Sequence, residues 1–166
     1  MTAVYFASVT LHVLAAMVWL GGLFFLGLVG APVLRRAEPA TLRQHLFHVL
    51  GLRFRVVGWS ALGVLVVTGL LNLQYRGLLQ WRGTLGEGVF WRSALGRALA
   101  VKLVAVAAMV VISFFHDWIY GPRSGLAPAE SPEAAAFRRR AVILAQVNTL
   151  LALVIVAAAV RVARGG

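Results

Sequence analysis

The chain has no cysteine, a single lysine and only five acidic residues among 166 positions. Without cysteine there can be no disulfide, no thiolate-bound metal, no iron–sulfur cluster and no covalently attached haem. No carboxylate lies buried within a long apolar run, which argues against a proton pump built on a carboxylate relay. The sequence also contains no P-loop, no GxGxxG fingerprint and no arrangement of residues typical of a nucleophilic triad.

Apolar residues dominate what is present. Hydrophobic residues make up 61% of the chain and charged residues 13%, and the mean hydropathy is +0.87. Soluble domains are not this apolar, so we predict an integral membrane protein whose main partner is the lipid bilayer. The net charge of +11 comes from arginines at the ends of apolar runs. That placement is typical of headgroup contacts, and we expect no nucleic-acid partner.

Four apolar runs are long enough to cross a bilayer: residues 4–34, 56–75, 95–119 and 141–160. We predict an all-α, up-down bundle of four transmembrane helices that forms one domain over residues 1–166. Residues 37–55 have an amphipathic pattern, and they either lie at the membrane interface or run straight into the second span. No internal repeat is evident.

Arginine counts predict the orientation. Nine arginines lie near the loops after the first and third spans, and six lie at the opposite end of the predicted bundle. The positive-inside rule then places both termini in the periplasm of a bacterial inner membrane.

His12 and Lys102 are ionisable residues inside predicted spans. Each lies about seven or eight residues from the same membrane face, so we expect them at similar depth on helices that can be neighbours. A buried cation costs at least ~2.5–3.5 kcal/mol unless it is paired or neutralised. Lys102 either serves a function or extends to the interface, and His12 is either a ligand or hydrogen-bonded to the backbone. Thr68 and Asn148 are expected to form hydrogen bonds between helices.

The third span continues this pattern. Lys102, Met109 and His116 are spaced by seven, which returns to nearly the same helix face. Met109 is either a soft metal ligand between Lys102 and His116 or an ordinary core residue. His45 and His48 have a spacing at which two imidazoles can bind one metal, and His48 and His116 can also be drawn as ligands on opposite sides of one haem.

The order of four sequence blocks resembles the copper-resistance D (CopD) family. The blocks are LHVLAAMVWLGGLFFLGLVGAPVLRR, LRFRVVGWSALGVLVVTGLLNL, LAVKLVAV followed by FFHDWIYGPR, and AQVNTLLALVIVAA. The resemblance implies a role in moving copper across or into the membrane. The pair of His12 and Lys102 is also similar to the HemJ family, which is linked to haem b and in which a first-span histidine and a later-span lysine act together.

Three functional hypotheses follow. In the first, the protein handles haem b or a metal ion, with His12 as ligand and Lys102 as charge partner, for example to a propionate, or as proton donor. In the second, it is a copper(I) conduit that uses His12, Met17, Met109 and His116. In the third, it is a cofactor-free subunit of a larger redox or transport complex. The sequence leaves open whether the chain is an enzyme, forms a homo-oligomer or has a redox partner.

Overall fold

The computed structural model describes residues 3–79, 84–128 and 131–165, and these contain helices and no strand. Two runs of helix have an irregular segment near one end, and two long helices are unbroken. The first broken run is α1 (Ala3–Phe25), η1 (Leu26–Gly30) and α2 (Ala31–Leu34), and the second is α5 (Ala94–Phe114), η3 (Phe115–Tyr120) and α6 (Gly121–Leu126). The unbroken helices are α3 (Ala40–Tyr75) and α7 (Pro132–Ala163), and two short elements, η2 (Thr84–Gly86) and α4 (Gly88–Arg92), precede α5.

Four helical stretches are long and apolar enough, by length and composition, to cross a membrane. They are Ala3–Leu34, Ala40–Tyr75, Ala94–Arg123 and Pro132–Ala163. Many of their large apolar side chains are exposed, for example Phe6 and Leu28, which suits contact with lipid and not with water. The all-α, multi-pass membrane fold predicted from the sequence is confirmed.

Two helices begin earlier than the hydrophobic runs suggested. The amphipathic segment at 37–55 is not separate, because α3 starts at Ala40 and continues directly into the second span. α7 starts at Pro132, nine residues before the predicted span, and the Ser131 side chain caps it by accepting a hydrogen bond from Ala134 N. A helix of 36 residues is about 54 Å long, against ~30 Å of hydrocarbon, so α3 extends well beyond the membrane core.

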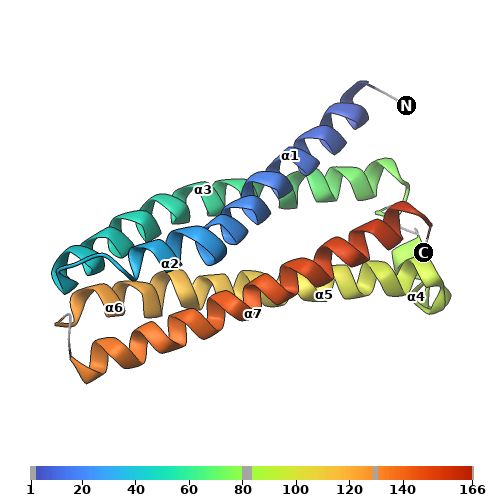
Figure 1. Cartoon of the computed structure of the whole chain (residues 1–166). Coiled ribbons are helices and arrows are strands. Elements are labelled where there is room, and N and C mark those ends of the chain that lie inside the picture. The colour runs from blue at the N-terminus through green and yellow to red at the C-terminus, as the bar shows by residue number, and fades with distance from the viewer. Residues whose placement is uncertain (1–2, 80–83, 129–130, 166) are drawn as a thin grey trace.

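The helices are arranged as two antiparallel hairpins. α1 packs along α3 and α5 packs along α7, whereas contacts between the two pairs are sparser (Figure 1). Both termini and α4 lie at one end of the bundle, which we call the terminal end. The turns that follow α2 and α6 lie at the other end, which we call the loop end (Figure 1).

One apolar cluster joins all four long helices. Trp19 on α1, Leu62 on α3, Met109 on α5 and Ala152 on α7 are buried against one another near the middle of the bundle. A second cluster lies at the terminal end, where Phe90 of α4 is buried with residues of α5 and α7. The central cluster separates the polar groups near the terminal end from those near the loop end.

Candidate functional site

His12 is held by a hydrogen bond between α1 and α3. Its Nδ1 lies 2.8 Å from Thr68 Oγ1, and Thr68 Oγ1 in turn lies 2.6 Å from the Val64 carbonyl oxygen. Because the single hydroxyl hydrogen of Thr68 is donated to that carbonyl, Thr68 accepts a hydrogen bond from the imidazole N–H. This assignment leaves Nε2 with its lone pair, so His12 can act as a metal ligand through that atom.

A second hydrogen bond between α1 and α3 lies one turn closer to the terminal end, and the two bonds together form a polar seam of Ser8, His12, Thr68 and Asn72. Ser8 Oγ donates to Asn72 Oδ1 at 2.9 Å, again between α1 and α3. Ser8 and Thr68 are both buried, and His12 is half-buried. The His12 ring also packs against α3 at Gly69. These contacts fix the orientation of His12 in an apolar surrounding.

Lys102 lies at a depth comparable to that of His12. It is eight residues into α5, as His12 is nine residues into α1, which corresponds to about 12–14 Å from each helix start. Lys102 is half-buried and lies within electrostatic range of His12, and Arg76 at the end of α3 lies within range of Lys102. No carboxylate pairs with Lys102 in the part of the chain that the structure describes. Lys102 and Arg76 therefore lie near each other at the terminal end without a carboxylate partner among the described residues.

Met109 lies below these groups, at the centre of the membrane-spanning region. Only 3% of its surface is exposed, and it packs with Trp19, Leu62 and Ala152. Met17, by contrast, is 63% exposed on the outside of α1. Of the two internal methionines, Met109 alone has a place inside the bundle.

The loop end has a polar cluster of its own. His116 Nδ1 and Asp117 Oδ1 lie 2.8 Å apart, and Trp59 Nε1 donates to Asp117 Oδ2 at 2.8 Å. The carboxylate holds His116 by Nδ1, which leaves Nε2 unengaged. Trp118, in the same irregular segment η3, stacks against Arg55 with the guanidinium carbon 5.3 Å from the ring centre.

His45 and His48 are both exposed on the first turns of α3. Within the described residues no group of three or more histidine, aspartate and glutamate side chains is close enough to hold one metal ion. The predicted metal site at His45 and His48, and the predicted haem site between His48 and His116, therefore gain no support from the geometry. They remain predictions.

Asn148 confirms the expectation of a hydrogen bond between helices. Its Nδ2 donates to Ser113 Oγ at 2.8 Å and so joins α7 to α5 one turn from Met109. Asn148 is 4% exposed, and its Oδ1 has no hydrogen-bond partner among the described residues. Thr68 forms the matching link between α3 and α1.

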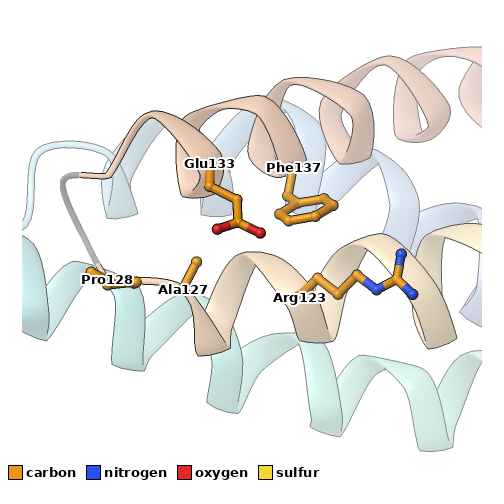
Figure 2. Close-up of a pocket in the computed structure, with 5 residues that line it drawn as sticks. All are labelled: Arg123, Ala127, Pro128, Glu133 and Phe137. Carbon is orange, nitrogen blue, oxygen red and sulfur yellow. The ribbon is translucent and has the colours of Figure 1, made fainter.

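A cavity of about 550 Å³ lies at the loop end between α6 and α7. Figure 2 shows the Glu133 carboxylate and the Phe137 ring reaching from α7 toward α6, with Ala127 and Pro128 on the opposite wall. The Arg123 guanidinium lies 6.0 Å from the centre of the Phe137 ring. This cavity is distant from His12 and Lys102, and none of the predicted ligands lines it.

Residues 48–162 match the family described as CopD, copper resistance protein D. The chain belongs to the CopD family. It is also 34% identical over 115 residues to an uncharacterised protein of Aquifex aeolicus (strain VF5), a match that covers 69% of this chain and 68% of that protein. No solved structure matches it significantly.

The CopD match covers some candidate residues and not others. Lys102, Met109 and His116 lie within residues 48–162, together with His48, whereas His12 lies before that range. The family membership therefore supports a link to copper resistance for the chain. It does not by itself assign a role to His12.

Ser8, Asn72 and Ser113 are polar partners that the sequence reasoning missed. A signal was present, because Ser8 lies four residues before His12 and Asn72 four residues after Thr68. Residues four apart share a helix face, so two otherwise apolar helices each show a short polar stripe. Only the packing of α1 on α3 shows that the two stripes meet.

Proposed function

We propose that this CopD-family protein binds copper(I) within the bilayer as its cargo, with Nε2 of His12 as a ligand. The observation that supports this most is the hydrogen bond from His12 to Thr68, since it leaves an imidazole lone pair available in an apolar setting. Copper(I) favours soft and imidazole ligands. The Met109 sulfur in the central cluster and Nε2 of His116 at the loop end supply such ligands further along the bundle.

Copper(I) binding by purified protein tests this proposal. In detergent, competition with a copper(I) chelator should show one tight site in the wild type and a loss of at least about 100-fold in affinity for His12→Ala. His45→Ala is the matched control, because it removes an exposed histidine and should leave the affinity unchanged. Equal affinities for His12→Ala and the wild type, with both proteins folded, would exclude His12 as a ligand.

A second candidate function is haem b binding, which the cluster of Lys102 and Arg76 near His12 favours. One imidazole with two cations that have no carboxylate partner among the described residues suits a haem that has a single histidine ligand and two anionic propionates. The absorption spectrum of protein purified after haem-replete expression should then show a Soret band that His12→Ala abolishes. Lys102→Met should fold normally, since it removes a costly buried charge, but should weaken the band. A colourless wild type would rule out this candidate.

The outcomes of these two experiments also bear on the third hypothesis. A folded protein that takes up neither copper(I) nor haem would be a cofactor-free subunit, and its partner would then have to be sought by purification of the intact complex.

We further propose that both termini face the periplasm of a bacterial inner membrane, on the basis of the arginine bias toward the loop end. The natural absence of cysteine makes labelling straightforward. A membrane-impermeant thiol reagent applied to intact spheroplasts should label Arg164→Cys and leave Glu133→Cys unlabelled. The reverse result would show the opposite orientation.

A further inference from the structure

The two hairpins bury residues in the same register. All three buried residues of α1 have a buried counterpart in α5 that lies 90 positions later. The pairs are Ser8 and Ala98, Ala15 and Ala105, and Trp19 and Met109. Every buried position of α1 therefore aligns with α5 at one constant offset, whereas Gly96 and Leu99 of α5 correspond to Phe6 and Val9, which are not buried.

The second helices of the hairpins continue the relation at the same offset. Three of the four buried residues of α3 have a buried counterpart in α7. The pairs are Gly58 and Asn148, Leu62 and Ala152, and Thr68 and Ala158. Because one offset relates both helices, the relation extends over whole hairpins and not over single helices.

The breaks in the first helices also correspond. Phe24, Phe25 and Pro32 recur as Phe114, Phe115 and Pro122, again at the offset of 90. Between these markers each helix widens into a π-helical segment, η1 in the first hairpin and η3 in the second. Each is then followed by a short helix with proline in its first turn, α2 or α6.

The two hairpins have the same direction in the membrane. α1 and α5 both start at the terminal end, and α3 and α7 both return to it (Figure 1). Two like-oriented repeats are related by an axis along the membrane normal, as in transporters whose site lies at the interface of parallel repeats. Trp19 and Met109, which are counterparts, meet in the central cluster, as residues near such an axis must.

His12 and Lys102 are counterparts in this relation, since their numbers also differ by 90. We infer that the chain consists of two equivalent hairpins around an approximate twofold axis, and that the cargo binds on this axis between residues 12 and 102. The identity of the cargo as copper(I) rests on the proposed function. The position of the site rests on the repeat, which explains why two chemically different residues share one depth and lie within electrostatic range of each other.

The supporting residues differ between the repeats, which makes the inference testable. Thr68 accepts the hydrogen bond from His12, and its counterpart Ala158 has no group that can do so. A histidine moved to position 102 would therefore face the axis without a partner for Nδ1. Adding a hydroxyl at position 158 would restore that partner.

The experiment exchanges the site between the hairpins. The double variant His12→Lys with Lys102→His should bind copper(I) about 10–100-fold more weakly than the wild type, since the moved imidazole has no hydrogen-bond acceptor beside it. Adding Thr68→Ala and Ala158→Thr should return the affinity to within about tenfold of the wild type. The inference is overturned if the quadruple variant folds but loses copper(I) affinity as completely as His12→Ala does.

Cysteine cross-linking tests the geometry independently of copper and of the fate of the exchange variants. α1 and α5 are not among the helix pairs in close backbone contact, so a direct disulfide between them is not expected. In the cysteine-free chain, a short bifunctional thiol reagent should instead join His12→Cys to Lys102→Cys, because both positions face the axis. Leu14→Cys with Val104→Cys is the matched control, since these positions are also 90 apart but are 52% and 70% exposed. Equal cross-linking of both pairs, or faster cross-linking of the control, would show that residues 12 and 102 do not meet on an axis.

A wild type that binds no copper(I) would reject the proposed function while cross-linking still decides the position of the axis. If the wild type binds copper(I) at His12 but the quadruple variant does not bind it, the proposed function stands and the shared site on the axis is rejected.

Discussion

The α1–α3 hairpin has its buried polar residues near the terminal end, whereas the α5–α7 hairpin has them near the middle and at the loop end. In the first hairpin, Ser8 binds Asn72 and His12 binds Thr68. In the second hairpin, Lys102 is the only polar residue at the four corresponding positions. The hydrogen bond that links its two helices, between Asn148 and Ser113, lies nearer the middle of the bundle. The two hairpins thus share a packing register but place different chemistry on it.

The difference shows how each hairpin satisfies its own polar groups. Hydrogen bonds within a hairpin avoid the cost of an unpaired polar group in hydrocarbon. Between hairpins the polar links are few and mostly at the loop end, where Trp59 donates to Asp117 and Gln44 donates to the Ala127 carbonyl. At the terminal end Arg76 donates a hydrogen bond to the Val162 carbonyl, so the two hairpins are linked there as well.

The largest expected effect concerns a contact that only the second hairpin has. A Cβ at Gly96 would collide with the backbone of Phe90 and Trp91, because α4 crosses the start of α5 there. Backbone cannot move aside as a side chain can, so Gly96→Ala should lower the free energy of unfolding by about 3 kcal/mol or more. Thermal unfolding in detergent measures this.

Gly21→Ala is the control for that change, since nothing lies within 4 Å of a Cβ at Gly21 in the first hairpin. Alanine has the higher helix propensity, so this variant should be as stable as the wild type or slightly more stable. Similar losses in the two variants would show that α4 does not restrict position 96.

An intermediate effect is expected for Thr68, which distinguishes the polar seam of the first hairpin from its apolar counterpart. Thr68→Val keeps the shape but removes the acceptor for the His12 N–H, and copper(I) affinity should fall about 10–100-fold. Ala158→Ser adds a hydroxyl at the equivalent position of the second hairpin and should leave the affinity unchanged. Chelator competition measures both affinities. An unchanged affinity in Thr68→Val would show that copper(I) binding does not depend on the hydrogen bond between His12 and Thr68.

The smallest effect concerns the link between the hairpins. Trp59→Phe keeps an aromatic ring beside Trp118 but removes the N–H that donates to Asp117. Hydrogen bonds between membrane helices contribute about 0.6 kcal/mol on average, so a loss of about 1 kcal/mol in unfolding free energy is expected. A loss of several kcal/mol would mean that this bond, and not the central apolar cluster, holds the two hairpins together.

Several features of the protein follow from its sequence alone. Mean hydropathy and run length predict four spans and a membrane location, because each span must cover the hydrocarbon by itself. The similar depth of His12 and Lys102 also follows, since depth is counted from the span ends. Even the partners Thr68 and Asn148 could be expected to bond between helices, because isolated polar residues in lipid need a partner.

Other features were decided by the tertiary structure. The spacing of His45 and His48 places them on one face, but only packing shows that this face is exposed. The amphipathic pattern of residues 37–55 allowed either a segment at the membrane interface or a helix that continues into the second span, and only the structure shows that α3 runs unbroken from Ala40. The equivalence of the hairpins is also hard to see in the sequence, because most of the aligned buried residues share burial and not identity, as Trp19 and Met109 do. Burial depends on how each helix is rotated against its neighbours, and that rotation is set by contacts between residues far apart in the chain.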